Sequence, residues 1–345
     1  MTDLLPSTTT ATDLAEPTKG RAQGGLAFVL RTIGGGLISM ALIVVLGFFM
    51  FRVLPGDPVR AMTRDRPGNP EQLARLRAEF GLDQPLPQQF LDYLGDLARG
   101  DLGTSYKYSQ PVTDLILGRL WPTVLLTGTA LVISVALGLW LGSRAAWRHG
   151  SAFDRFTTAT ALVLWSVPTF WLGLIVLMVF AVALDLFPTA GMTSPGGVDG
   201  FFPAVLDVAH HLVLPCLTMV AVVYAQYLMV MRSSLLEEMT ADYLTTARAK
   251  GLREDLVRRR HAVPNALLPT ITIIFLQVGF VVSGAVTVET VFSWPGLGLL
   301  TYQALAVPDI PLLQGTLIAL SSAVVIMNVA ADLVYRLVDP RVRTR

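Results

Sequence analysis

Long apolar runs alternate with shorter polar stretches along most of the chain. In six places the sequence continues for about 20 residues or more without Asp, Glu, Lys or Arg. A helix rises about 1.5 Å per residue, so such a run crosses about 30 Å of hydrocarbon with its backbone groups paired internally. The pattern predicts an all-α membrane protein with six transmembrane helices. The runs are 32–51, 121–143, 156–184, 212–231, 262–288 and 310–331.

The long polar segment between the first two runs also has a helical pattern. Asn69 and Pro70 suit the start of a helix, and Gly81 suits its end. Apolar residues recur at helical spacing in the same segment, so short amphipathic helices are expected. They form a folded cap that either packs on the membrane domain or docks a partner. The predicted helices are 70–81, 87–100 and 111–120.

Composition supports the membrane interpretation. Hydrophobic residues make up 53% of the chain and charged residues 15%, against about 25% charged residues in soluble domains. The positive charges are dispersed and lack an accompanying aromatic strip, so nucleic acid is not an expected partner. The single cysteine, Cys216, excludes an internal disulfide.

The positive charges set the expected orientation. From the N-terminus, the segments outside the runs hold 3, 9, 3, 0, 7, 0 and 4 Lys and Arg residues. Only the segment with 9 breaks the alternation, and loops beyond about 60 residues cross a membrane largely regardless of charge. Both termini are therefore expected in the cytoplasm. The expected organisation is a cytoplasmic tail, disordered at its start (1–31), a first transmembrane helix (32–54), an external helical loop (55–120), a five-helix core (121–331) that includes the polar loop 232–261, and a C-terminal cytoplasmic tail (332–345).

The interiors of the runs contain neutral polar groups but no carboxylate, Lys or Arg. Ion-coupled carriers usually need such charges near the bilayer midplane, so that class is disfavoured. The neutral groups suit either a polar pathway or hydrogen bonds between helices. The candidate pathway residues are Ser166, Thr169, Gln277, Ser283 and Asn328.

No phosphate-binding loop of the G-x-x-x-x-G-K-[ST] type occurs, so the chain is not expected to hydrolyse ATP by that device. An intramembrane protease would need Ser166 or Ser283 with His210 or His211 as base. The two histidines precede the fourth run, and neither serine lies in a G-x-S-x-G motif. We therefore assign no catalytic residue and no metal ligand, and we expect no enzyme activity.

The polar loop 232–261 contains a short helix over 241–250. Thr240 suits its N-cap, Asp242 its positive end and Gly251 its left-handed stop. Ala241, Thr245 and Ala249 recur every four residues and form a narrow ridge that a partner's groove could approach closely. The same pattern fits an ordinary interfacial helix.

Several segments together resemble bacterial ABC importer permeases of the dipeptide, oligopeptide and nickel branch. The loop 242–252 resembles the "EAA" loop of that family. The other resembling segments are 54–58, 81–86, 100–103, 166–172, 212–215, 265–269, 288–298 and 339–343.

The resemblance implies a type I importer permease fold and a coupling helix that seats in a cytoplasmic ATPase subunit. Thr245 stands where the general motif has Glu, which removes one expected salt bridge to the ATPase. Pro264 replaces a basic residue and is expected to break the chain before the fifth run. The implied coupling residues are Asp242, Tyr243, Thr245, Thr246, Ala247, Arg248, Ala249, Lys250 and Gly251.

The resemblance also implies the assembly and its cargo. The expected partners are a second permease, two ATPase subunits or one fused ATPase, an external solute-binding protein and the lipid bilayer of a bacterial cytoplasmic membrane. ATP and Mg²⁺ would bind in the ATPase partners, and no cofactor is expected in this chain. Di- or oligopeptides are the expected cargo, with nickel or glutathione as the alternative.

The external loop 289–309 is a candidate apolar lid or plug above the pathway. The alternative is a static turn that packs against the external helices. The candidate lid residues are Glu289, Phe292, Trp294, Pro295, Gly296 and Gly298.

Overall fold

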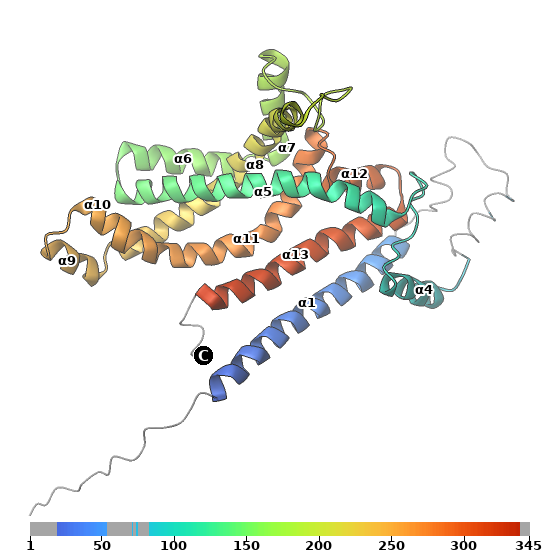
Figure 1. Cartoon of the computed structure of the whole chain (residues 1–345), viewed down its shortest axis with the longest axis horizontal. Coiled ribbons are helices and arrows are strands. Elements are labelled where there is room, and N and C mark those ends of the chain that lie inside the picture. Colours follow the sequence, from blue (N-terminus) through green and yellow to red (C-terminus); the bar gives the residue numbers. More distant parts are fainter. Residues whose placement is uncertain (1–18, 54–70, 72–73, 75–82, 339–345) are drawn as a thin grey trace, which may run out of the picture.

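The computed structural model describes residues 19–53, 71, 74 and 83–338. Every regular element in this part of the chain is a helix, as the sequence predicts (Figure 1). The helices are α1 (Lys19–Val53), α4 (Leu86–Ala98), α5 (Val112–Trp147), α6 (Ala152–Ser166), α7 (Thr169–Val176), the π-helix η1 (Leu177–Ala183), α8 (Phe201–Glu238), α9 (Asp242–Ala249), α10 (Glu254–Leu256), the π-helix η2 (Val257–Ala262), α11 (Val263–Val291), α12 (Leu297–Ala306) and α13 (Ile310–Val338).

Four of the described helices, α1, α5, α8 and α13, contain a segment long and apolar enough to cross a membrane. If the bent pair of α6 with α7 and η1 is one span, the described residues contain up to five spans. The fifth predicted run lies in α11, which is 29 residues long. Several side chains of α11 lie outside the described residues. The predicted count of six spans is therefore not confirmed.

The third predicted run is not one continuous span. α6 and the α7–η1 helix meet at an angle of 104°. Pro168 disfavours helical geometry at the residue before it, and Val167 indeed adopts an extended conformation with ψ 131°. The run 156–184 was predicted as one transmembrane helix, but the helix ends at this Val-Pro step and restarts in a new direction.

Close packing of α5 on α8 forms the centre of the fold. Small buried residues recur every four positions on α5 at Ala130, Ser134, Gly138 and Gly142. A Cβ atom on Gly142 would lie 2.6 Å from the carbonyl oxygen of Leu228, so the two backbones approach too closely for any side chain there. Small residues at this spacing let membrane helices pack closely without strong apolar driving force.

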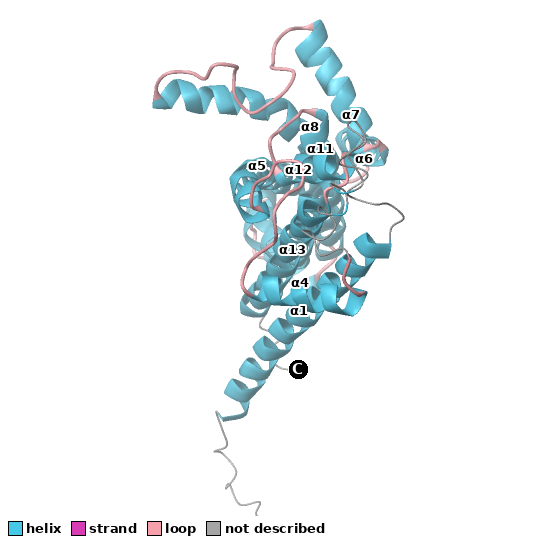
Figure 2. Ribbon diagram, turned by 90° about the vertical axis from the view of Figure 1, so that its right-hand side faces the viewer, coloured by secondary structure: helices cyan, strands magenta, loops and turns pink. Residues whose placement is uncertain are grey.

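α1 and α13 pack side by side in opposite directions. A Cβ atom on Gly36 would lie 3.0 Å from Val329, and one on Gly47 would lie 2.8 Å from Leu317. The long helices place α9 and α10 at one end of the bundle, and α4 and α12 at the other (Figure 1). Figure 2 shows α7 and the start of α8 projecting beyond the bundle.

The described residues confirm two of the predicted short helices before the second run. α4 is the helix expected over 87–100, and the helix expected over 111–120 is the first part of α5. The third, 70–81, lies outside the described residues except for Glu71 and Ala74, which are helical.

Candidate functional site

The short helix α9 has two different faces. Leu244 is fully buried and Ala247 is 7% exposed, whereas Thr245, Arg248 and Ala249 are exposed. Residues three apart in a helix share a face, so the two buried residues hold α9 against the bundle. The predicted small-residue ridge faces outward, because Thr245 and Ala249 are exposed. We call these exposed residues, with Asp242, Thr246 and Lys250, the outer face of α9.

The inner face of α9 packs on one hydrophobic cluster, which we call the α9 seat. It joins the ends of α5, α8 and α11 with η2, so four separate elements meet beneath the short helix (Figure 1). A displacement of α9 would therefore press on several long helices at once. The buried members are Ala146, Met231, Leu235, Leu244, Ala247, Val257, Ala262 and Ala266.

The sequence predicts the C-terminal end of α9 correctly but not its N-terminal cap. Thr240 does not cap the helix; its hydroxyl donates to the carbonyl of Glu237 at 2.8 Å and closes the end of α8 instead. The predicted cap was wrong because α8 runs farther than its apolar run. Gly251 adopts φ +78°, the left-handed stop that was predicted. The amides of Gly251 and Leu252 donate back to Arg248 and Ala247, which is a Schellman ending.

Tyr243 links α9 to the helices on both sides of it. Its hydroxyl donates to the carboxylate of Glu238 at the end of α8 and accepts from the Asn265 amide of α11 at 2.9 Å. Burial, and then the neighbouring Glu238, raise the pKa of Tyr243 above its ordinary value. On the outer side, Arg248 pairs with Glu254 at 2.9 Å. Through its bonds to Glu238 and Asn265, neutral Tyr243 thus fixes the orientation of α9 relative to α8 and α11.

The chain does not break at Pro264, contrary to the sequence prediction. η2 leads directly into α11, and Pro264 occupies the first turn of that helix. Pro264 cannot donate a backbone hydrogen bond within this continuous helix, and the π turn directly before it is the kind of irregular turn at which the regular i→i−4 pattern is interrupted. The path from the α9 seat into α11 is therefore continuous helix.

An ion pair beside the α9 seat joins α6 to α8. The guanidinium of Arg232 donates from Nε to Asp154 Oδ1 at 2.6 Å and from Nη2 to Asp154 Oδ2 at 2.9 Å. The side chains are 19% and 3% exposed. His149 contacts both partners from the α5–α6 turn. Two parallel bonds fix direction as well as distance, so this pair locks the start of α6 to the end of α8.

At the opposite end of the bundle, the carboxylate of Glu289 is fully buried. It accepts from the Thr123 hydroxyl at 2.7 Å and from the backbone amides of Gly298 at 2.7 Å and Leu299 at 3.1 Å. The two amides belong to the first turn of α12, where helices favour an anion. Glu289 therefore caps α12 and ties it to α5.

The rest of the candidate lid is packed around this carboxylate. Trp294 is fully buried and donates from Nε1 to the carbonyl of Pro122 at 2.9 Å. A Cβ atom on Gly296 would lie 2.2 Å from Glu289, so the turn needs glycine there. Phe292 is also buried, and Pro295 is half-buried. In this conformation, the geometry is that of a packed turn against α5.

A second buried carboxylate, Asp309, has a similar role that the sequence did not predict. It accepts from the Ser105 hydroxyl at 2.6 Å and from the Lys107 amide at 3.0 Å. It also accepts from the Leu312 amide in the first turn of α13. The segment before α5 is thereby fastened to α13.

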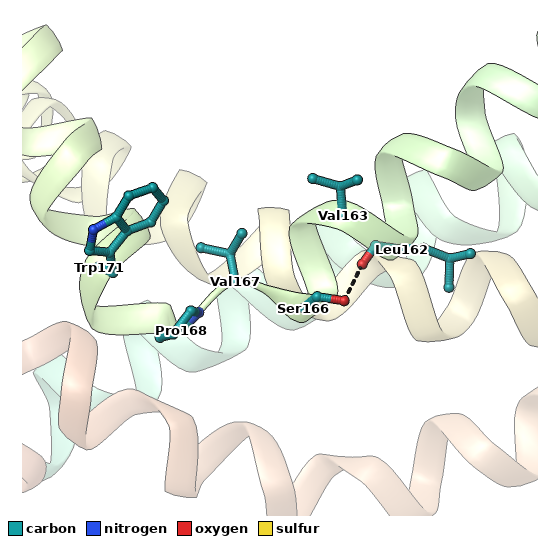
Figure 3. Close-up of a pocket in the computed structure, with 6 residues that line it drawn as sticks. All are labelled: Leu162, Val163, Ser166, Val167, Pro168 and Trp171. Carbon is teal, nitrogen blue, oxygen red and sulfur yellow. Dashed lines mark hydrogen bonds between the residues drawn. The ribbon is translucent and has the colours of Figure 1, made fainter.

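The candidate pathway residues do not gather in one place. Ser166 and Thr169 lie on either side of the bend between α6 and α7, and Ser166 lines an open pocket of about 600 Å³ there (Figure 3). Its hydroxyl is turned back to the Leu162 carbonyl at 2.8 Å. Asn328 lines a different groove, between α1 and α13. The side chains of Gln277 and Ser283 lie outside the described residues.

The histidines of the protease alternative bond to backbone carbonyls. His211 Nδ1 lies 2.8 Å from the carbonyl of Asp207, and His210 Nε2 lies 3.0 Å from that of Leu186. Cys216 is buried in the main apolar cluster. Among the described residues, no group of three His, Cys, Asp or Glu side chains could hold a metal ion.

A helical membrane domain with a short, two-faced helix at one end is the architecture of an importer permease. The fold is similar to that of the MetNI methionine ABC transporter in an inward-facing form, with a TM-score of 0.52 and 17% identity over 66% of this chain and 97% of that chain. This likeness concerns the type I importer permease fold alone.

The sequence comparisons show the family. Residues 134–344 match the family described as binding-protein-dependent transport system inner membrane component, and residues 25–127 match the corresponding N-terminal family. The chain belongs to this family, and it is a multi-pass inner-membrane protein.

Similar curated proteins are peptide permeases. The dipeptide transport system permease protein DppB of Escherichia coli (strain K12) is 37% identical over 338 residues, covering 92% of this chain and 99% of that protein. The di/tripeptide transport system permease protein DppB of Pseudomonas aeruginosa (strain UCBPP-PA14) is 36% identical over 335 residues with the same coverage. The predicted peptide ABC permease family is thus confirmed.

Proposed function

We propose that this chain forms half of the translocation pathway of an ATP-driven importer for di- or oligopeptides. A second permease supplies the other half, two ATPase subunits or one fused ATPase supply the energy, and an external solute-binding protein delivers the peptide. ATP and Mg²⁺ bind in the ATPase partners. The names of the similar permeases support the peptide cargo; nickel or glutathione is the alternative within the same family.

The two-faced packing of α9 carries the coupling part of the proposal. Its inner face is buried against the ends of α5, α8 and α11, and its outer face is free of contacts that would bury it. A short helix of this kind can seat in a cleft of an ATPase subunit and pass that subunit's movement to the long helices. Asp242, Arg248 and Lys250 supply its charges.

The proposed orientation places α9 and both termini in the cytoplasm, and α4 and α12 outside. The positive charges support it, since the 232–261 loop holds 7 Lys and Arg residues and the 289–309 loop holds none. The proposed tail, external loop, core and C-terminal boundaries follow the same charge pattern.

Ala249→Trp should abolish stable association with the ATPase subunits while the permease still inserts and folds. Ala249 is exposed, so the large ring would disturb the docking surface without entering the α9 seat. Affinity co-purification of the assembled transporter measures the effect. The matched control is Ser233→Trp, an exposed position on α8 at the same end of the bundle. If the ATPase subunits co-purified in full amount with the Ala249→Trp permease, docking through this face would be ruled out.

We propose further that the 289–309 turn acts as an external lid that must loosen during transport. If so, Trp294→Ala removes a buried ring and its bond to Pro122, and should change peptide uptake or the basal ATPase rate of the assembled complex. Leaving both quantities unaltered would reject the lid and leave a static turn.

Reconstitution tests the whole proposal. Proteoliposomes that contain both permeases and the ATPases should accumulate a labelled dipeptide only with internal ATP and the external binding protein. Uptake by this chain alone, or uptake driven by an ion gradient without ATP, would contradict it. Competition with nickel or glutathione separates the cargo alternatives.

A further inference from the structure

A groove of about 480 Å³ runs between α1 and α13, away from α9 and the candidate lid. Its α1 wall is a stripe of one helix face from Phe28 to Ser39, roughly 16 Å long at 1.5 Å per residue. Its α13 wall includes Val325, Asn328 and Asp332. The groove therefore follows the contact of two antiparallel helices.

One end of the groove is charged and lies at a membrane boundary. Arg31 directly precedes the first apolar run, and Asp332 directly follows the last one. Both are exposed and line the groove, and neither forms an ion pair with a described residue. Within the part of the chain that the structure describes, a cation and an anion without an ion-pair partner thus lie at the same end of one groove, beside the amide of Asn328.

Two glycines of α1, Gly35 and Gly36, line the groove. Gly34, Gly35 and Gly36 follow one another within α1, although glycine weakens a helix by about 1 kcal/mol relative to alanine. Gly36 is explained by its close contact with Val329, but a Cβ atom on Gly35 would meet nothing within 4 Å. Gly35 lines the groove, so its missing side chain enlarges the open space.

We propose that this groove binds one phospholipid with a zwitterionic headgroup, such as phosphatidylethanolamine. The guanidinium of Arg31 holds the phosphate, the carboxylate of Asp332 holds the ammonium, and an acyl chain lies along Gly35 toward Val325. Charge complementarity selects this headgroup. A phosphatidylglycerol molecule offers a phosphate but no cation, so Asp332 would face it without a partner.

The test is native mass spectrometry of the assembled transporter in mild detergent, with phosphatidylethanolamine or phosphatidylglycerol added at equal concentration. We expect phosphatidylethanolamine to be retained about tenfold more than phosphatidylglycerol, and Asp332→Asn to remove that preference. Gly35→Leu should fill the groove and abolish retention. Gly34→Leu is the matched control, because it adds the same side chain to the next residue, has equally open surroundings and does not line the groove.

Equal retention of the two lipids by the unaltered transporter would overturn the proposal. So would full retention by the Gly35→Leu transporter. A photoactivatable phosphatidylethanolamine should also cross-link to peptides of α1 or α13. If a cross-linker placed at Asn328→Cys captures the second permease instead, a protein and not a lipid covers the groove. None of these outcomes depends on the cargo or on docking through α9.

Discussion

Arg232→Ala should leave ATP hydrolysis by the assembled transporter running while peptide uptake falls by about tenfold or more. The change removes both guanidinium bonds to the carboxylate of Asp154, which is only 3% exposed, and breaking a buried pair costs about 3 kcal/mol. Met231 and Leu235, on the same end of α8, belong to the α9 seat. Without the ion pair, a displacement of α9 can still move α8 but is no longer transmitted from α8 to α6.

Measurements of ATP turnover and peptide uptake on the same proteoliposomes check the prediction for Arg232→Ala. Arg232→Lys retains the charge but not the two parallel bonds, so an intermediate loss of uptake is expected. Arg155→Ala is the control: it removes a neighbouring exposed arginine whose side chain, among the described residues, bonds only to the carbonyl of Gly150. If Arg232→Ala lowered ATP turnover and uptake equally, the pair would serve assembly and not transmission.

Local patterns predicted the helices well because apolar runs and loop charges are properties of short segments. The ending of α9 at Gly251 follows in the same way, from one residue able to adopt φ +78°. The break at Pro168 was visible as a proline, but the sequence does not state the angle through which a helix turns there. Thr240 failed as a cap because α8, set by its packing, extended past its apolar run.

The polar contacts that hold the two ends of the bundle were not predictable in this way. Thr123 and Glu289 are 166 positions apart, Ser105 and Asp309 are 204 apart, and Asp154 and Arg232 are 78 apart. Each charged member stands at the edge of an apolar run. Such residues are ordinarily taken as solvated helix ends, yet here they are the groups that fasten one helix to the next. A charge at a run boundary is the signal that could have found them.

Glu289→Leu should lower the thermal stability of the purified permease and remove peptide uptake with it. The change leaves the Gly298 and Leu299 amides and the Thr123 hydroxyl without their buried acceptor. Each unsatisfied buried group costs about 1–3 kcal/mol, so a total loss of at least about 3 kcal/mol is expected. The N-terminus of α12 also loses its anion.

Two further variants distinguish the loss of the Glu289 hydrogen bonds from the other effects of replacing a carboxylate side chain. Glu289→Gln can still accept from the two amides, but its NH₂ group meets the Thr123 hydroxyl, which already accepts from the Leu297 amide. A smaller loss of stability is therefore expected. Asp199→Leu, at an exposed loop position, controls for the loss of a carboxylate. The temperature at which half of the purified protein has unfolded or aggregated in detergent, at one fixed heating rate, measures all three, since unfolding of such proteins is often irreversible. Equal stability of Glu289→Leu and Asp199→Leu would mean that the buried carboxylate does not hold α12 to α5, and α12 would then be free to move as a lid without breaking any strong contact.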